Sequence, residues 1–228
     1  MQANENKSLT IEVDGVVYER YPIKTHVVTD KDDIRDVAQN YAQEHMQQGD
    51  LLFISEKCVA CTQKRAIPMD EIKPRPLAKL LCKFVYKSPY GIGLSIPQTM
   101  EMALRECGTL KILFAAFCSA FGKLVGKRGI FYDIAGPKAK SIDGPCDCTI
   151  PPYNNYVVLG PENPDEVAKA IKQRIGFDVL IVDINDLDGT ILGTSDDSID
   201  RLLYARVLKD NPLGQSRQQT PMGIIRRI

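Results

Sequence analysis

An acidic cluster follows one strongly apolar run of the chain. Residues 179–184 are apolar except for Asp183, and Asp186 and Asp188 come soon after them. Between Asp183 and Asp200 the sequence holds six Asp and no Lys or Arg. Carboxylates crowded at the end of a strand repel one another unless they share a cation, and hard oxygen ligands suit Mg²⁺ or Mn²⁺. The spacing therefore predicts a divalent-cation site, and a solvated acidic turn is the alternative interpretation.

A polar, turn-rich segment, residues 210–221, connects an expected helix to an expected strand near the end of the sequence. Its polar side chains include those of Asn211, Gln215 and Arg217. Two interpretations stay open, an exposed hairpin loop and a ligand-binding loop, because loops on rigid supports often carry binding groups.

Two cysteine pairs offer a different metal chemistry. Cys58 and Cys61 have C-x-x-C spacing, Cys146 and Cys148 have C-x-C spacing, and four thiolates together could hold one Zn²⁺. The second pair lacks the usual two-residue spacer, and no His lies near either pair in the sequence. Because the N-terminal residues show no apolar run of signal-peptide length, we expect seven reduced thiols in a cytoplasmic protein.

The two histidines limit the schemes of nucleophilic catalysis that are open to this chain. We expect His45, on the apolar face of a helix, to be a packed side chain. His26 precedes the apolar residues Val27 and Val28 and could reach a ligand.

The charge balance bears on the kind of partner. The chain has 228 residues, with 29 Lys plus Arg and 29 Asp plus Glu, so its formal net charge is zero. This balance argues against a protein that simply coats nucleic acid or an anionic membrane. The longest apolar stretch, about residues 110–121, is shorter than the ~20 residues that a membrane span needs. We therefore expect neither nucleic acid nor a membrane as partner.

The elements that must position these residues follow from apolar periodicity and from Gly and Pro signals. We expect a hairpin turn at Asp14-Gly15 and a helix start in which Asn163 caps and Pro164 takes the first position. The other expected helices are residues 31–48, a segment opening at Pro74 and Pro76, 97–106 and 198–210. The expected strands are residues 51–54, 110–117, 129–135, 157–159, 179–184 and 222–225, with a long loop at 136–155. Helices and strands alternate without a strict rhythm, so we predict an α+β fold of mixed sheets with packed helices.

Several short segments follow one another in a characteristic order between residues 25 and 226. They are residues 25–28, 32–34, 49–54, 55–65, 141–144, 159–165, 181–189 and 220–226. Their order resembles that of the coenzyme F420:L-glutamate ligase family, the deazaflavin γ-glutamyl ligases. The chain departs from the family pattern at Cys61, which replaces a lysine, and it lacks the arginines that follow the strand-end Asp and the full Asn-Ala-Gly-Ile-Asp-x-Ser-Asn segment. The resemblance indicates a divergent member, with a single γ-glutamyl ligase-like domain over residues 1–228 and a smaller lobe around 75–150.

The resemblance implies a metal- and GTP-dependent enzyme that forms an amide between L-glutamate and a carboxylate-bearing small molecule through an acyl phosphate. It also implies a homodimer that uses Mg²⁺ or Mn²⁺. The metal candidates are Asp143 and Asp186, which the resemblance favours, with Asp183 and Asp188 from the acidic cluster. The implied nucleotide site is lined by Thr25, His26, Val27, Val28, Ser55, Glu56 and Lys57.

Two other functions stay open. The first is a non-catalytic nucleotide- or small-molecule-binding protein on the same scaffold, because phosphoryl transfer needs the positive charge that the missing lysine and arginines supply. The second is a zinc-thiolate protein built on the two cysteine pairs.

Overall fold

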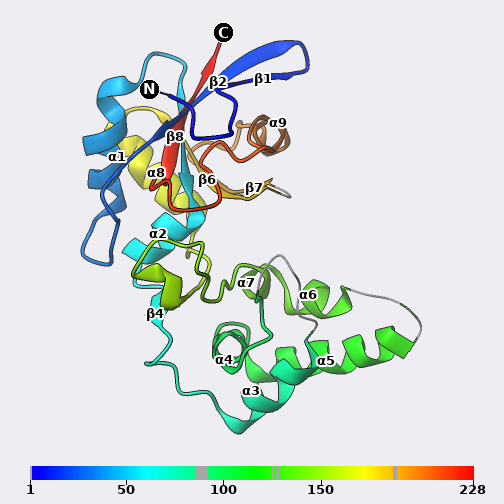
Figure 1. The fold of residues 1–228 in the computed structure, drawn as a ribbon. Helices are drawn as coiled ribbons and strands as arrows, with labels where there is room; N and C mark the ends of the chain where they lie inside the picture. The colour runs from blue at the N-terminus through cyan, green and yellow to red at the C-terminus, as the bar shows by residue number, and fades with distance from the viewer. Residues whose placement is uncertain (1, 86–91, 125, 127–128, 187–188) are drawn as a thin grey trace. The chain divides into compact units, whose positions relative to one another are not determined.

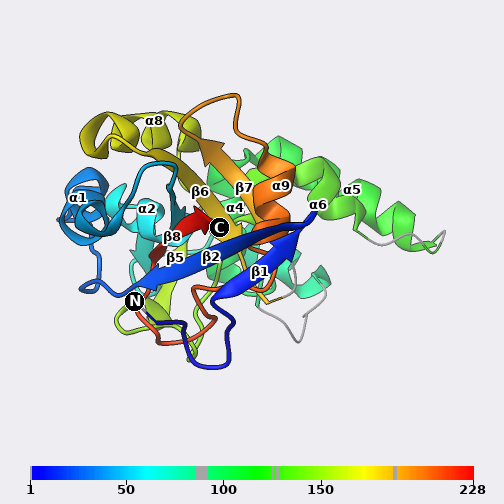
Figure 2. The same ribbon diagram turned by 90° about the horizontal axis from the view of Figure 1, so that it is seen from above.

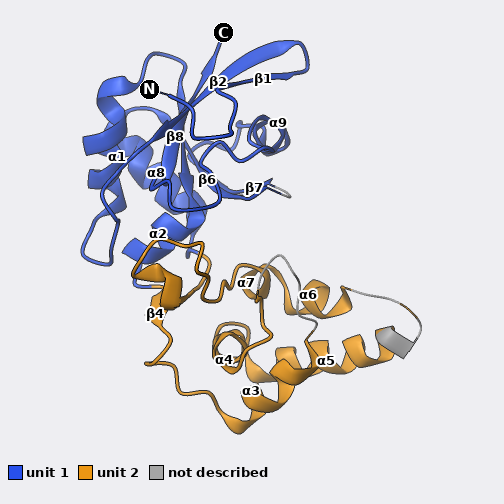
Figure 3. Ribbon diagram, in the orientation of Figure 1, with its two compact units in different colours: residues 1–64, 161–228 blue, residues 65–160 orange. Residues whose placement is uncertain are grey.

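The computed structural model describes residues 2–85, 92–124, 126, 129–186 and 189–228 (Figure 1). By their internal contacts these residues form two compact units, coloured separately in Figure 3. Unit 1 contains residues 1–64 and 161–228, and unit 2 contains residues 65–160. The mixture of helices and a mixed sheet confirms the α+β prediction. The prediction of a single domain with a lobe around 75–150 stays a prediction.

Unit 1 is built on a six-stranded sheet in the order β1-β2-β8-β3-β6-β7. The strands are β1 (Thr10–Val13), β2 (Val16–Ile23), β3 (Leu51–Ser55), β6 (Asp178–Ile184), β7 (Gly189–Thr194) and β8 (Met222–Arg227). The pair β3–β6 is parallel, and the other pairs are antiparallel. The predicted hairpin turn joins β1 to β2, with positive φ at both Asp14 and Gly15, as a type I′ turn requires.

Both faces of the central strands are buried. On β3, Leu52 and Ile54 belong to one apolar cluster, while Phe53 between them belongs to another, as the alternation of side chains along a strand requires. The first cluster is covered by α1 (Ile34–Ala42), α2 (Glu56–Thr62) and α8 (Pro164–Ile175), and the second by α9 (Arg201–Val207). Figure 2 shows α9 across the sheet from α1, α2 and α8, so unit 1 has three layers.

Unit 2 has a separate apolar core and is mainly helical. Its α-helices are α3 (Pro76–Leu81), α4 (Pro97–Glu106), α5 (Thr109–Leu124), α6 (Ile130–Ala135) and α7 (Pro137–Lys140). Short 3₁₀ turns are η2 (Cys82–Phe84) and η3 (Tyr153–Asn155), and a further one in unit 1, η1 (Gln43–His45), extends α1. The strands β4 (Ala66–Pro68) and β5 (Tyr156–Val158) pair antiparallel, so the two ends of unit 2 lie together.

Several sequence predictions are wrong in detail. The expected strands at 110–117 and 129–135 are replaced by α5 and by α6, which begins at Ile130, and the expected loop at 136–155 contains α7 and η3. The His45 side chain is partly exposed beside Glu44 instead of packed in the core. Asn163 precedes α8 with a positive φ, and its side chain makes no capping hydrogen bond. In the described part of the chain, no helix is long and apolar enough to cross a membrane.

Candidate functional site

The candidate nucleotide segments and Asp186 lie at the same end of the central strands of unit 1, whereas Asp196 and Asp197 follow β7 at the opposite end. Ile23 at the end of β2 pairs with Met222 at the start of β8, and Met222 pairs with Ile54 near the end of β3. Because β3 and β6 are parallel, with Ser55 opposite Val182, the segments that follow these two strands leave at the same edge. The register therefore gathers residues 24–28, 55–57, 185–186 and 219–221 on one side of unit 1, a group that we call the sheet-edge site.

The segment after β2 is fixed to the segment before β8. The backbone amide of Thr25 donates to the carbonyl of Gln219 at 3.2 Å, and the Gln219 amide Nε2 donates to the carbonyl of Thr25 at 2.6 Å. Thr25 and Val28 are buried, whereas His26 is exposed. The predicted residues Thr25, His26, Val27 and Val28 thus form a well-anchored segment that presents one imidazole to the surface.

The His26 imidazole contacts Tyr41 on α1 and Asp32, which precedes α1. Its Nδ1 lies 2.9 Å from the Tyr41 hydroxyl, and its Nε2 lies 3.1 Å from Asp32 Oδ1. Asp32 Oδ2 in turn accepts hydrogen bonds from the amide and the hydroxyl of Thr29, at 2.7 and 2.9 Å. Burial alone would raise the pKa of Asp32, but these bonds and His26 outweigh it and lower the pKa below its ordinary value. A carboxylate that stays ionised orients the imidazole, as in acid–base and ligand sites.

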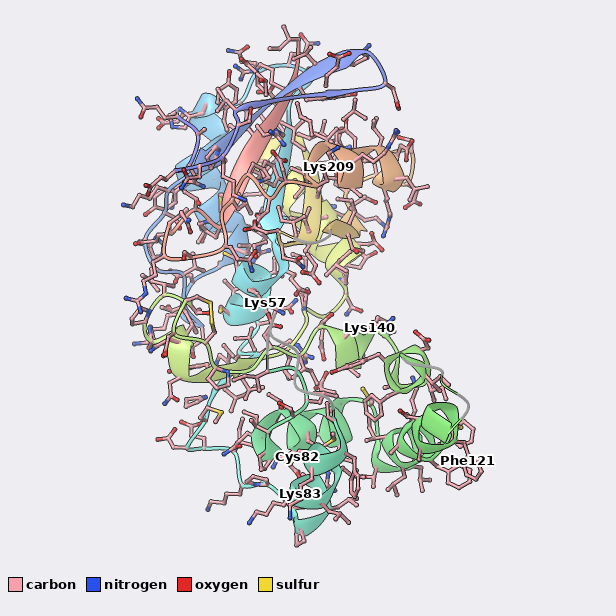
Figure 4. The ribbon with its side chains drawn as sticks, turned by 45° about the vertical axis from the view of Figure 1, so that its right-hand side comes forward. Lys57, Cys82, Lys83, Phe121, Lys140 and Lys209 are labelled. Carbon is pink, nitrogen blue, oxygen red and sulfur yellow. A yellow bond between two sulfur atoms is a disulfide. The ribbon has the colours of Figure 1, made fainter. Side chains whose placement is uncertain are left out.

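Ser55, Glu56 and Lys57 connect β3 to α2. The Ser55 amide donates to the carbonyl of Pro221 at 2.8 Å, which joins this turn to the segment before β8. Glu56 is only 2% exposed, and Lys57 Nζ lies 2.6 Å from its Oε1. A carboxylate buried this deeply requires a compensating charge, and the Lys57 ammonium supplies it. The pair keeps a lysine at the sheet-edge site, at the position that Figure 4 labels on α2.

Of the acidic metal candidates, one lies on β6 and another lies in the segment that follows β6. Asp183 lies on β6 opposite Thr190, and Asp186 follows the strand. Asp188 lies outside the described residues. Asp186 Oδ1 accepts from Lys7 Nζ at 2.7 Å and from Asn211 Nδ2 at 3.3 Å. Within the described residues, no three His, Cys, Asp or Glu side chains come together as a metal cluster. Asp186 forms its ion pair with the Lys7 ammonium instead.

The loop before β8 supplies further oxygen atoms beside Asp186. Asn211 is 1% exposed, and its Nδ2 also donates to the carbonyl of Gly214 and to Gln215 Oε1, at 3.1 and 3.0 Å. Gln215 Oε1 accepts from the Asp186 amide as well, at 3.2 Å. The buried Asn211 Oδ1 has no hydrogen-bond partner among the described residues. Carboxylate and amide oxygens are the kinds of ligand that Mg²⁺ and Mn²⁺ prefer. Here the Asp186 and Gln215 oxygens accept hydrogen bonds from protein donors.

The structure answers part of the question about residues 210–221. Residues 211–213 are buried, while Gln215 and Arg217 are exposed. Asn4 Nδ2 donates to the carbonyls of Pro212 and Leu213 and to the Thr220 hydroxyl, which fixes the loop from outside. The segment is therefore an ordered loop with a buried base, and not an exposed hairpin along its whole length.

Asp143 belongs to unit 2, whereas Asp183 and Asp186 belong to unit 1. Its backbone pairs with that of Val158, with N–O distances of 2.8 and 3.0 Å, which extends the β4–β5 ribbon by one bridge. The two metal candidates favoured by the resemblance thus lie in different units.

The cysteines do not form the four-thiolate site. Cys146 and Cys148 are joined to each other by a disulfide, so the expectation of seven reduced thiols is wrong for this pair. Cys58 and Cys61 are buried on α2, in the other unit. Burial, with Cys61 and Asp32 nearby, raises the pKa of the Cys58 thiol, and a raised pKa disfavours the thiolate that Zn²⁺ or redox chemistry needs. We therefore do not retain the zinc-thiolate interpretation.

Sequence reasoning missed Lys7, Asn4 and Tyr41. Lys7 and Asn4 lie in a polar segment that looks unstructured in the sequence, and their partners are more than 170 positions away. Tyr41 shows the helical spacing of a core residue, and its hydroxyl contact with His26 leaves no trace in that pattern. Spacing along the chain holds no signal for any of the three.

Two comparisons bear on this site. Residues 22–197 match the family model described as F420-0:Gamma-glutamyl ligase. Over 230 residues the chain is 26% identical to the coenzyme F420:L-glutamate ligase of Methanopyrus kandleri, and the match covers 86% of this chain and 81% of that relative. The span of the family model includes residues 25–28, 55–57, 143 and 183–186, but neither Lys7 nor the loop at 210–221.

Proposed function

This chain belongs to the F420-0:gamma-glutamyl ligase family, and on that premise we propose that it is a metal- and GTP-dependent ligase. It joins the amine of L-glutamate to the carboxylate of a small molecule. The relative from Methanopyrus kandleri is named for coenzyme F420 and L-glutamate, so a precursor of coenzyme F420 is the first acceptor to test.

The proposed reaction has two transfers. An acceptor carboxylate oxygen attacks the γ-phosphorus of GTP, the bond to the β-phosphate oxygen breaks, and GDP leaves. The amine of L-glutamate then attacks the resulting acyl phosphate, phosphate leaves with the C–O bond electrons, and the amine loses a proton to give the amide. A bound Mg²⁺ or Mn²⁺ neutralises phosphate charge in such transfers.

The observation that carries the proposal is the convergence of the family-matched segments on the sheet-edge site. Lys57, held by Glu56, would bind phosphate oxygens, since a fixed ammonium stabilises the charge of a transferring phosphoryl group. His26, oriented by Asp32 and Tyr41, would bind the nucleotide or take the amine proton. Asp186 with the oxygens of Asn211 and Gln215 would hold the divalent cation, with Asp183 as the further candidate in unit 1. Asp143, in unit 2, is a separate metal candidate.

The experiment follows GTP hydrolysis in the presence of Mg²⁺ or Mn²⁺, with and without L-glutamate and the acceptor. We expect hydrolysis that needs both substrates, together with a product heavier by one glutamyl residue. Lys57→Ala should lower kcat/KM by about 100-fold or more, because it removes a cation from the transferring phosphate. Lys209→Ala is the matched control, an exposed lysine of unit 1 that Figure 4 also labels. Equal activity of both variants would remove Lys57 from the site.

A non-catalytic binding protein is the second candidate, and the Lys7–Asp186 ion pair favours it. An ammonium on Asp186 already supplies the positive charge that a divalent cation would bring. Under this alternative, GTP raises the melting temperature but is not consumed, because ligand that binds only the folded state stabilises it. The homodimer expected from the family resemblance also stays a proposal.

A further inference from the structure

Unit 2 carries a disulfide at its surface. Cys146 and Cys148 are joined across a single residue, Asp147, and all three residues are exposed in the loop between α7 and η3. The other five cysteines of the chain are buried or partly buried thiols: Cys58, Cys61, Cys82, Cys107 and Cys118. The two sulfur atoms of the disulfide are therefore the ones that a reagent in solution reaches most readily.

A structural role does not account for this disulfide. A cross-link stabilises a fold mainly by closing a loop of the unfolded chain, and the effect grows with the length of that loop. Here one residue separates the cysteines, and both lie in the same segment, so the bond ties no separate parts of unit 2 together. The unit is held by its apolar core, to which Ile142 and Val157 contribute on either side of the segment. Exposed disulfides are the labile class, with regulatory or catalytic roles.

Backbone hydrogen bonds, besides the S–S bond, hold the two cysteines in one turn. The Thr149 amide donates to the Cys146 carbonyl at 3.0 Å, which closes a turn around the pair. The Cys148 amide donates to Cys146 Sγ at 3.3 Å. A hydrogen bond to sulfur favours the ionised form of a thiol, so the same amide would stabilise a Cys146 thiolate. The geometry thus suits both states, because the turn keeps the pair close and the amide stabilises the charge that forms when the bond opens.

We propose that Cys146 and Cys148 are a reversible thiol–disulfide exchange site, with a dithiol as the reducing partner. A thiolate of the dithiol attacks Cys148 Sγ, the S–S bond breaks, and Cys146 leaves as the thiolate that the Cys148 amide stabilises. The second thiol of the dithiol then loses its proton and attacks the dithiol's own sulfur in the mixed disulfide, so Cys148 leaves as a thiolate in turn. The dithiol departs as a disulfide. Two electrons have passed to the pair, and the two protons given up by the dithiol protonate the two cysteines.

The exchange acts on a segment that begins next to Asp143. The backbone of Asp143 is bonded to that of Val158 in both directions, at 2.8 and 3.0 Å, and this bridge fixes the start of the segment. A closed ring of bonded residues has fewer backbone conformations than an open chain, so reduction increases the conformational freedom of residues 144–152. The redox state of the pair is therefore a local switch beside one of the metal candidates. The exchange itself does not rest on the proposed function.

The test is a count of thiols in the folded, full-length chain after incubation with mixtures of reduced and oxidised dithiothreitol. Each sample is quenched with acid, labelled with a maleimide in denaturant and measured by intact-mass spectrometry. We expect five labels in the oxidising mixture and seven in the reducing one, with two labels gained together and lost again on reoxidation. The double variant Cys146→Ser/Cys148→Ser should keep five labels in both mixtures. Cys107→Ser, a partly buried cysteine of the same unit, is the matched control and should still gain two.

Two further measurements separate exchange from a structural role. Reduction of the wild type should lower the melting temperature by less than about 4 °C, because the disulfide closes so short a loop. Reduction should also speed the hydrogen exchange of amides in residues 144–152, and dithiothreitol should not change that exchange in the double serine variant.

Three results would overturn the proposal. They are a disulfide that dithiothreitol reduces only after the chain is unfolded in urea, seven labels in both mixtures, and a larger fall in melting temperature on reduction. No readout here uses ligase activity, so failure of this proposal does not bear on the proposed function.

Discussion

At the scale of single residues, the sheet-edge site is a set of polar groups that are already paired. Asp186 accepts hydrogen bonds from Lys7 and Asn211. Glu56 pairs with Lys57, and His26 pairs with Asp32. Asp186 could be proposed from the sequence, because carboxylates near a strand end indicate cation chemistry, and the family resemblance implied His26, Glu56 and Lys57. Their pairing could not, because Lys7 and Asp186 are 179 positions apart and only the folded chain brings them together.

The Lys7–Asp186 pair gives a prediction for cation binding. Lys7→Met removes an ammonium that competes for Asp186, and an ion pair near the surface contributes up to about 1 kcal/mol, so Mn²⁺ should bind about fivefold more tightly. Asp186→Asn removes a ligand charge and should weaken Mn²⁺ binding by about tenfold or more. The measurement is a Mn²⁺ titration followed by electron paramagnetic resonance. Lys209→Met is the control, and wild-type affinity in both Lys7→Met and Asp186→Asn would exclude Asp186 as a ligand.

At the scale of elements, the sequence predicts best where start and stop signals are present. Helix α4 has the predicted bounds, because Pro97 occupies its first turn and Gly108, with a positive φ, follows its end. Helix α5 was expected to contain a strand, because an apolar run has no clear period when both faces carry apolar residues. The same property that makes α5 hard to predict leaves Leu110, Phe114 and Phe117 exposed on its surface.

Helices α3 and α4 are joined through one buried carboxylate. Glu101 on α4 accepts from the backbone amide and Nε of Arg75 at 3.0 Å and from Arg105 Nε at 2.9 Å. Burial would raise the pKa of Glu101, but these bonds outweigh it, and the pKa is lowered below its ordinary value. The carboxylate therefore stabilises the fold at pH above the ordinary glutamate pKa, and this contribution is lost as pH falls through the lowered pKa.

The prediction for Glu101→Gln is a loss of about 1.5–3 kcal/mol in the free energy of unfolding at neutral pH, the usual range for hydrogen bonds to a charged group. The difference in the free energy of unfolding between Glu101→Gln and the wild type should shrink as the pH falls toward the lowered pKa of Glu101. Urea denaturation at a series of pH values measures both effects. Glu166→Gln, in an exposed ion pair with Lys169, should change stability by less than about 0.5 kcal/mol. A constant difference between wild type and Glu101→Gln at all pH values would contradict the assignment.

At the scale of the whole molecule, the chain leaves unit 1 after Lys64 and returns at Pro161. The two ends of unit 2 are closed on each other, because the Leu159 amide donates to the Arg65 carbonyl at 3.0 Å and Arg65 Nε donates to the Gly160 carbonyl at 2.6 Å. The resemblance implied a smaller lobe around residues 75–150, and a strand was expected at 157–159. The closure was not predicted, because β4 has only three residues and does not stand out from the surrounding sequence. Closed ends and a separate core are properties of a segment that can fold alone.

We therefore expect residues 65–160, expressed alone, to unfold cooperatively on heating, with a sigmoidal change in both far- and near-ultraviolet circular dichroism. Leu94, Met100, Leu104 and Ile112 are fully buried in this segment and provide its core. Leu104→Ala should lower the melting temperature of the segment or abolish its cooperative transition, since a buried Leu→Ala change lowers the free energy of unfolding by about 2–5 kcal/mol. Secondary structure without a near-ultraviolet signal in the wild-type segment would show that it depends on unit 1.

The place of β8 in the sheet has a consequence for how the protein is made. This strand lies between β2 and β3, yet it follows every other described element in chain order. A ribosome that adds roughly 5–20 residues per second releases β1, β2 and β3 well before β8 exists. During that interval the unpaired backbone N–H and C=O groups along the edges of β2 and β3 are exposed templates for aggregation. Unit 2, whose segments are contiguous, can reach its fold during translation, whereas unit 1 must wait for its central strand.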